Sequence, residues 1–374
     1  MKNQATRRTE ELGRVSLRRL RLSVSLALTL GVLRGPAANL AAPPPTEIIG
    51  FMKLTCLGLS DTIVSAPLAR LPEYEGRGTG LDVIAGSSGK IAFSGTPFTA
   101  GQFKYVAGVQ PNTYYAFVAS GSKEGDYFTI TDNDTNSVQV DLNGDTLAGI
   151  TAGTTVKIVP FWTLATLFPN GQGVTPTSGF TPATQILLPD TASAGNNLTA
   201  ASIYTYSAAS GTWSQFGSEG PANDTIFYPD NYFTVRNNAP AMTTIVVNGA
   251  VVVNKQLTAL TTNAATKQDN FVAVMRPTPM SLNESGLIAS GAFRASSGFT
   301  TSDQLFVFDN TVAQLNKAAA ASYTYSNGAW RRFGVTGDAG ADIVFTPGAG
   351  VIIRKARNSS GATSVWTSPA TLPN

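Results

Sequence analysis

Two clusters of tyrosine and tryptophan recur along the chain with almost the same spacing. They consist of Tyr204, Tyr206, Trp213 and Phe216, and of Tyr323, Tyr325, Trp330 and Phe333. On a β-strand the two tyrosines of each cluster share one face, and a hairpin returns the tryptophan opposite them. An outward face of this kind is a flat platform for sugar rings, because amphipathic aromatic rings suit a half-wet binding surface.

The same spacing also fits a buried packing unit. Aromatic residues that point inward fill a core, and a pattern that repeats with nearly constant spacing is typical of a packing module. The sequence therefore favours a core role for the two clusters and leaves a carbohydrate platform as the alternative.

A short polar segment carries alternating oxygen ligands of the kind that calcium loops use, in Asp132, Asp134 and Asn136. It lacks the glycine next in register and the closing bidentate glutamate of an EF-hand loop. A polar β-turn is the favoured interpretation over a metal site, and we expect no cofactor.

Catalytic chemistry is restricted because the chain contains no histidine. This excludes Ser-His-Asp and Cys-His catalysis, histidine-ligated zinc and any histidine general base. A glycosidase needs only two carboxylates, and Glu73 and Glu75 would share one face of a strand. Pro72 and Gly76 beside them indicate a solvated loop instead. We therefore expect a protein that is not an enzyme.

The elements that position these residues are predicted to be β-strands. After Pro43-Pro44-Pro45 the chain consists of short runs rich in Val, Ile, Thr, Tyr and Phe, with a period of two. Turn dipeptides such as Asn143-Gly144 and Asn327-Gly328 separate these runs and suit tight hairpins. The sequence predicts an all-β fold of tandem or packed antiparallel sandwiches or barrels.

Internal similarity is the strongest organisational signal. Gln185 and Asp190 recur as Gln304 and Asp309, displaced by 119 positions, and Tyr204 to Ser207 recur as Tyr323 to Ser326. Later matches are Trp213 with Trp330, Pro229 with Pro347 and Arg236 with Arg354. A degenerate repeat is expected, with copies at about residues 178–260 and 297–374.

A fainter third copy is suggested upstream. Residues 127–130 resemble 232–235, and Ser60 to Ile63 resemble Ser302 to Leu305. We therefore expect an N-terminal β domain at residues 43–170, as a divergent copy, and two repeat copies within residues 171–374.

The first residues have the composition of a secretory signal. A basic segment precedes an apolar run from Leu22 to Leu33, and small residues follow. This run is shorter than a membrane span, so residues 1–42 are expected to be a cleaved signal peptide, and the mature form to have no membrane span. Without them, 18 basic residues face 21 acidic ones, which turns the net charge of +3 into −3. Nothing in this balance favours nucleic acid as a partner.

Several segments resemble an uncharacterised family of exported proteins known chiefly from Verrucomicrobia. They are Gly50 to Leu54, Leu59 to Pro67, Pro160 to Leu164, Tyr323 to Trp330 and Ile353 to Lys355. The resemblance implies secretion and brings no activity, cofactor or catalytic residue.

We expect an exported, non-catalytic structural or adhesive protein that is periplasmic, at the cell surface or extracellular. The alternative is a carbohydrate-binding protein that uses the repeated tyrosine and tryptophan hairpins. The expected partners are polysaccharide or further copies of the chain.

Overall fold

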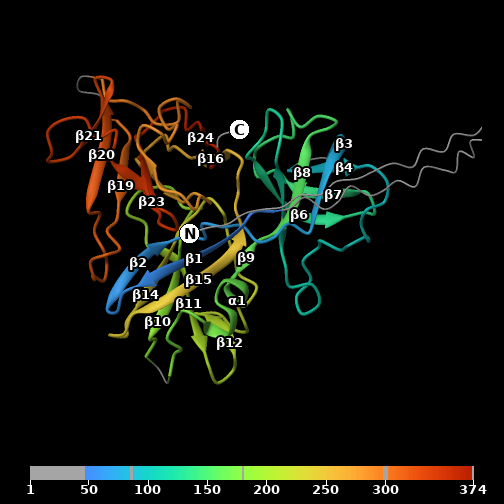
Figure 1. Cartoon of the computed structure of the whole chain (residues 1–374), viewed down its shortest axis with the longest axis horizontal. Helices are drawn as coiled ribbons and strands as arrows, with labels where there is room; N and C mark the ends of the chain where they lie inside the picture. The colour runs from blue at the N-terminus through green and yellow to red at the C-terminus, as the bar shows by residue number, and fades with distance from the viewer. Residues whose placement is uncertain (1–46, 85–86, 179–180, 298–301, 373–374) are drawn as a thin grey trace, which may run out of the picture. The chain divides into compact units, whose positions relative to one another are not determined.

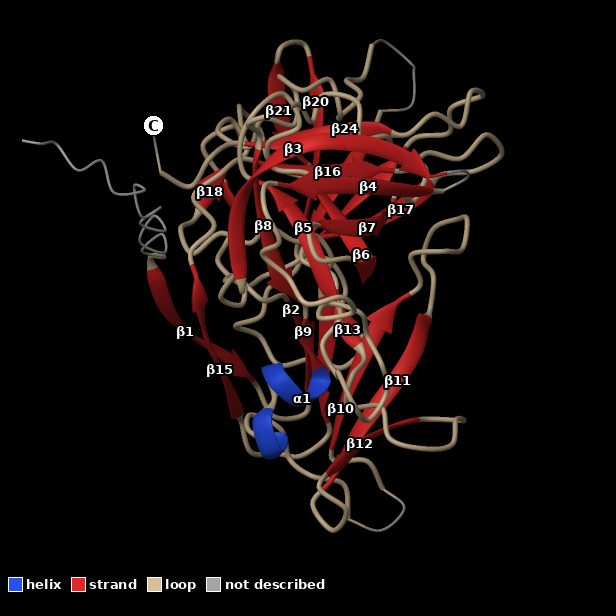
Figure 2. Cartoon of the chain, turned by 90° about the vertical axis from the view of Figure 1, so that its right-hand side faces the viewer, coloured by secondary structure: helices blue, strands red, loops and turns tan. Residues whose placement is uncertain are grey.

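The structure is a computed structural model that describes residues 47–84, 87–178, 181–297 and 302–372 (Figure 1). The expected signal peptide at residues 1–42 lies outside the described residues. The all-β prediction is confirmed, since the regular structure is almost entirely β-strand (Figure 2). Helix is confined to the single turns α1 (Leu164–Leu167) and η1 (Pro169–Gly171) within the described ranges. The described residues contain no helix long and apolar enough to cross a bilayer.

Six strands close into a barrel. In their order around it they are β3 (Tyr74–Ile84), β4 (Ser88–Phe93), β7 (Ser137–Asp141), β6 (Tyr127–Asn133), β5 (Tyr114–Val118) and β8 (Thr155–Pro160). The alternation of β4 buries Ile91 and Phe93 inside the barrel, where they join Phe103 and Tyr114. Closure removes exposed strand edges.

A five-stranded antiparallel sheet forms the centre of a second region, here called domain A. Its strands, in spatial order, are β12 (Thr212–Gln215), β11 (Ala200–Ser207), β10 (Thr184–Pro189), β14 (Phe233–Asn237) and β2 (Ser60–Val64). Two further strand pairs complete it: β1 (Ile49–Cys56) with β15 (Thr243–Ala250), and β9 (Trp162–Thr163) with β13 (Ile226–Phe227).

The third region, domain B, has the same strand order. Its five-stranded sheet consists of β21 (Ala329–Arg332), β20 (Ala321–Ser326), β19 (Gln304–Val307), β23 (Val351–Lys355) and β17 (Gln268–Val272). Its two additional pairs are β16 (Gln256–Leu260) with β24 (Ser364–Ser368), and β18 (Met280–Ser281) with β22 (Ile343–Phe345). Each element of domain B thus has a counterpart in domain A.

The strand pairing divides the chain differently from the domain boundary expected at residue 170. β1 and β2 pair with β15 and β14, so domain A is assembled from segments on both sides of the barrel. The barrel occupies the sequence between β2 and β9, whereas a short segment joins β17 to β18 in domain B. Residues 127–130 belong to the barrel, which has a different topology. Their likeness to residues 232–235 reflects alternation common to strands.

The counterpart of β2 is also different from the one expected. β2 pairs with β14 so that Asp61 faces Arg236, and β17 pairs with β23 so that Asp269 faces Arg354. Ser60 to Ile63 therefore correspond to residues 268–271, displaced by 208 positions, and not to Ser302 to Leu305. The inserted barrel makes this displacement larger than 119.

A loop from domain B is fastened to domain A by an arginine–aspartate pair. Arg236 donates from Nε and Nη2 to the two carboxylate oxygens of Asp61, both at 2.7 Å. Asn316, in the loop between β19 and β20, accepts a bond from Arg236 Nη2 at 2.7 Å. Its backbone N–H donates to Asp61 Oδ2 at 2.8 Å.

Domain A returns the same contact to domain B. Arg354 donates to Asp269 at 2.6 and 2.9 Å. Asn197, between β10 and β11, accepts from Arg354 Nη2 at 2.7 Å, and its backbone N–H donates to Asp269 Oδ2 at 2.8 Å. Asn197 and Asn316 both have a positive φ, 56° and 51°, which asparagine tolerates better than most residues. The two domains are therefore held together by a reciprocal exchange of loops.

Candidate functional site

The tyrosine and tryptophan clusters lie mainly in the cores of domains A and B. Tyr204, Tyr206 and Trp213 are 5%, 6% and 1% exposed, and the Tyr206 and Trp213 rings lie 5.5 Å apart. In domain B, Tyr323 and Trp330 are 4% and 1% exposed. A sugar platform needs an open ring face, and none of these five rings offers one. Their burial supports the core interpretation.

The remaining aromatic residues of the clusters differ from one another. Tyr325 is partly buried and packs edge-on against Trp330 at 5.4 Å. Phe216 and Phe333, at corresponding places after β12 and β21, are 82% and 88% exposed. Sequence spacing grouped the exposed phenylalanines with the buried rings, because the strand that carries the alternation ends before each of them.

The suggested calcium segment has its carboxylates paired with lysines. Lys104 Nζ lies 2.7 Å from Asp132 Oδ2, and Lys90 Nζ lies 3.2 Å from Asp134 Oδ2. The hydrogen bond from Lys104 holds the pKa of Asp132 below its usual value. Asn136 is exposed, and the described residues contain no group of three or more acidic, histidine or cysteine side chains placed to hold a metal.

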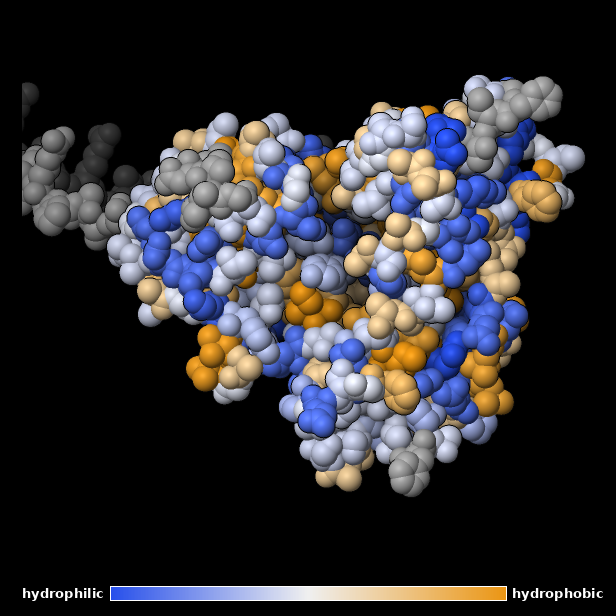
Figure 3. Space-filling model, turned by 180° about the vertical axis from the view of Figure 1, so that it is seen from behind, coloured by the Kyte–Doolittle hydropathy of each residue, from blue (hydrophilic) through white to orange (hydrophobic). Residues whose placement is uncertain are grey.

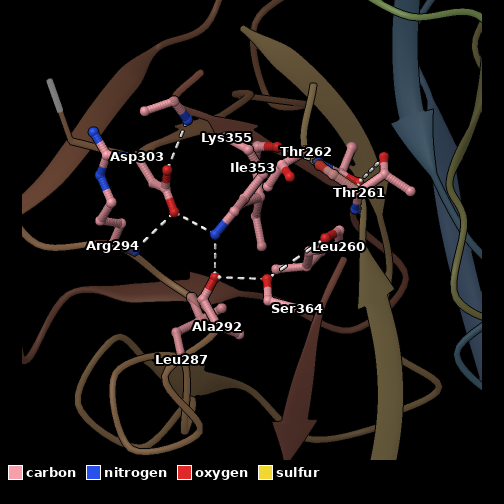
Figure 4. A network of polar contacts seen from close by, with 12 residues as sticks. Leu260, Thr261, Thr262, Leu287, Ala292, Arg294, Asp303, Ile353, Lys355 and Ser364 are labelled. Carbon is pink, nitrogen blue, oxygen red and sulfur yellow. Dashed lines mark hydrogen bonds and ion pairs between the residues drawn. The ribbon is translucent and has the colours of Figure 1, made fainter. Parts of the chain in front are cut away.

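A buried ion pair in domain B is another chemically distinctive feature (Figure 4). Lys355 Nζ donates to the carboxylate of Asp303 and to the carbonyl oxygen of Ala292. The backbone N–H groups of Arg294 and Ala356 donate to Asp303 Oδ2 and Oδ1, each at 2.7 Å. The Lys355 and Asp303 side chains are 5% and 1% exposed, so solvent and substrate have little access to them. We interpret this network as a structural support.

A large cavity lies where the barrel meets domains A and B. It has a volume of about 410 Å³ and is here called the central cavity. The barrel contributes the start of β6 and the end of β7 with the turn that follows, domain A contributes the segment between β13 and β14, and domain B contributes β16 and β17. From behind, hydrophilic and hydrophobic residues are interspersed over a surface that is hollowed near its middle (Figure 3).

Carboxylates from all three regions line the central cavity. They are Asp126, Asp141 and Asp145 from the barrel, Asp230 from domain A and Asp269 from domain B. Asp269 is compensated by Arg354, and Lys123 forms ion pairs with Asp126 and Asp145. No salt bridge reaches Asp141 or Asp230 within the described chain. The cavity therefore has a net acidic lining.

Burial raises the pKa of two of these carboxyl groups. Desolvation raises the pKa of Asp126 to about 6, opposed by the hydrogen bond from Lys123. Burial also raises the pKa of Asp230, whose Oδ1 accepts a hydrogen bond from the Tyr127 hydroxyl at 2.8 Å. This bond connects the barrel to domain A at the wall of the cavity.

Tyrosine and amide groups complete the lining. Tyr228 is 44% exposed and packs edge-on against Phe161 with ring centroids 5.7 Å apart. Asn270 accepts from the Thr261 N–H at 2.8 Å and donates to the Thr261 carbonyl at 3.0 Å, so it is fixed in place. Carboxylates, hydroxyls and an accessible ring together suit a polyhydroxylated ligand, and about 300–1,000 Å³ is usual for small-molecule sites.

The sequence did not reveal the central cavity, because its carboxylates are far apart along the chain. Asp126, Asp141 and Asp230 each lie at the end of a strand or in a turn, where aspartate is common. One signal was available for Asp269, since Asp61 and Asp269 each lie two residues before an apolar strand residue and face an arginine of the repeat.

Comparisons with family models, curated proteins and solved structures found no match to this chain. The resemblance to exported proteins of Verrucomicrobia therefore stays an expectation drawn from the sequence.

Proposed function

We propose that this chain is an exported, non-catalytic adhesive protein that binds carbohydrate in the central cavity. The observation that carries the proposal is the cavity itself, about 410 Å³ in volume and lined by carboxylates and tyrosines from three regions. Ligand sites occur preferentially where domains meet, and sugar hydroxyls donate readily to carboxylate oxygens. The proposed sugar-binding site is therefore the central cavity and not the tyrosine and tryptophan hairpins, whose rings are mostly buried.

Two residues have distinct roles in the proposal. Tyr228 offers a half-open ring on which the apolar face of a sugar stacks. Asp141 is exposed, and its Oδ1 accepts the Asn143 N–H at 3.0 Å, which leaves its other oxygen to accept from a sugar hydroxyl. The hydrogen bond from the Tyr127 hydroxyl to Asp230 fixes the shape of the cavity wall.

The test is calorimetric titration of residues 44–374, which contain every described element, with a panel of soluble polysaccharides and their oligosaccharides. We expect Tyr228→Ala and Asp141→Asn each to weaken binding about tenfold or more, which is about 1.4 kcal/mol. Phe216→Ala is the matched control, because this exposed ring lies outside the cavity lining.

Three outcomes would change the proposal. Binding lost in Phe216→Ala and kept in Tyr228→Ala would move the site to the hairpin ends. Sugar release during titration, abolished by Asp126→Asn or Asp230→Asn, would make the chain a glycosidase. Absence of binding across the panel would leave a purely structural role, which the reciprocal exchange of loops between domains A and B supports.

A further inference from the structure

β1 has one edge without a neighbouring strand among the described residues. Val251 N–H donates to Ile48 O, which fixes the ladder with β15 so that alternate residues of β1 turn their backbone groups the other way. These residues are Ile49, Phe51, Lys53 and Thr55. No backbone hydrogen bond from another described segment reaches them. Their side chains share one face, on which Ile49 is 60% and Phe51 59% exposed.

The corresponding strand of domain B has this edge covered. Leu257 of β16 turns its N–H away from β24 and donates it to the carbonyl of Gly125, at 3.0 Å, in the barrel. The Asn254 side chain adds a bond to Glu124 at 2.8 Å in the same turn between β5 and β6. In domain B a backbone carbonyl of the barrel therefore accepts a hydrogen bond from this strand edge. In domain A the described residues leave the corresponding edge open.

The open edge is complementary to itself. Phe51 and Lys53 lie on the same face, and Lys53 Nζ is 5.8 Å from the centre of the Phe51 ring. Suppose that the β1 strands of two copies pair antiparallel, with Met52 of one copy opposite Met52 of the other. Phe51 of each copy then lies opposite Lys53 of the other, and Ile49 lies opposite Thr55. All four are residues whose backbone groups point to the open edge, so the hydrogen-bonding pattern is satisfied as well. The two lysines are kept apart, and each gains an aromatic partner across the interface.

We propose that a second copy of this chain pairs with the first through β1, with Phe51 of each copy opposite Lys53 of the other. The contact is two-fold symmetric, which is the commonest arrangement of homodimers. It joins the two β1–β15 pairs into one continuous sheet and covers both open edges. The pairing is independent of the central cavity, whose lining contains no residue of β1.

The test is the mass of residues 44–374 measured by light scattering over a range of protein concentrations. We expect a monomer–dimer equilibrium, which Phe51→Lys shifts to monomer by placing lysines opposite one another. Adding Lys53→Glu to that variant restores the dimer, because the introduced lysine of each copy then faces the introduced glutamate of the other. Phe333→Lys, at an exposed phenylalanine outside β1, leaves the equilibrium unchanged.

A second variant separates edge blocking from misfolding. Phe51→Pro removes an N–H that points away from β15, so the β1–β15 ladder and the circular dichroism spectrum stay intact while dimerisation is lost. A parent protein that is monomeric at its highest soluble concentration would overturn the proposal. So would a dimer that survives Phe51→Lys, or a monomeric full-length chain beside a dimeric shorter one, which would mean that the preceding residues occupy the edge.

Discussion

Domains A and B use the same strand order around different polar interiors. In domain A, Thr184 at the start of β10 lies opposite Asn237 at the end of β14, and the two residues are 1% and 0% exposed. The corresponding residues of domain B are Asp303 and Lys355, which form a buried ion pair. One architecture therefore accepts a neutral pair or an ion pair at the same place, provided that its hydrogen bonds are satisfied.

The aromatic core is what the two domains keep in common. Trp213 packs against Phe168 and Tyr206, and Trp330 packs against Phe293 and Tyr325, with ring centroids between 4.9 and 5.5 Å apart. Buried rings with interlocking neighbours tolerate loss of volume poorly. The two cores therefore share the same ring packing and differ in the charge of their buried polar residues.

The largest expected effect comes from removing either tryptophan. Trp213→Ala and Trp330→Ala should each lower the free energy of unfolding by about 3–5 kcal/mol, because each leaves a cavity in a packed core. Denaturant unfolding followed by circular dichroism measures this. The exposed counterparts Phe216→Ala and Phe333→Ala should change it by less than about 0.5 kcal/mol. Similar losses at all four positions would remove the distinction between core and surface rings.

The ion pair of domain B should respond differently from the neutral pair of domain A. Asp303→Ala should cost about 3 kcal/mol, because it leaves the Lys355 ammonium buried without its partner. Asn237→Ala should cost about 1–2 kcal/mol, the usual range for lost hydrogen bonds of a buried polar group. The double variant Asp303→Thr with Lys355→Asn copies domain A into domain B. Its stability should lie close to that of the parent, and a loss as large as that of Asp303→Ala would contradict the equivalence.

Breaking either loop contact should have a smaller effect. Asn197→Ala removes the side-chain bond to Arg354 and disfavours the positive φ, so a loss of about 1–2 kcal/mol is expected. Asn316→Ala should match it, because its contacts with Arg236 and Asp61 have the same geometry. Asn197→Gly is the control, since it keeps the backbone conformation and should recover part of the loss. Unequal losses would show that the two loop contacts differ in energy although their hydrogen-bond distances match.

The smallest expected effect is a pH dependence from Asp126. Its pKa of about 6 in the fold exceeds the value of about 4 in an unfolded chain, so the folded state binds more protons in that interval. Its contribution to stability therefore falls as pH rises from about 4 to about 6 and is constant above. Relative to the parent, Asp126→Asn should gain stability across this window. Asp190→Asn should show no change in this window, because hydrogen bonds from Ser193 lower the pKa of the Asp190 carboxyl.

Much of the fold follows from local sequence pattern. Alternation and turn dipeptides predict the strands, and the displacement of 119 correctly aligns Gln185 with Gln304, while Arg236 and Arg354 occupy matching register positions opposite them. The position of β2 in the sheet cannot be predicted from local pattern, because the barrel lies between β2 and its partner β14 in the sequence. Whether Trp213 faces inward is also undecided by alternation, since a strand has two faces and only packing distinguishes them.

The candidate site depends on contacts that no local pattern encodes. Tyr127 and Asp230 meet across the boundary of the barrel and domain A, 103 positions apart in the sequence. Each is an ordinary residue in its own segment. Their combination into a cavity wall is a property of how three β regions assemble.

Amide hydrogen exchange resolved to single residues tests most directly whether the strand edge that is covered in domain B is open in domain A. In dilute, monomeric protein the Leu257 amide should exchange slowly, because Gly125 accepts its hydrogen bond, while the Phe51 amide should exchange fast. At concentrations that favour the dimer, Phe51 should become protected and Leu257 should not change. Equal protection of the two amides in the dilute monomer would contradict the account, because the edge of β1 would then be covered within one chain.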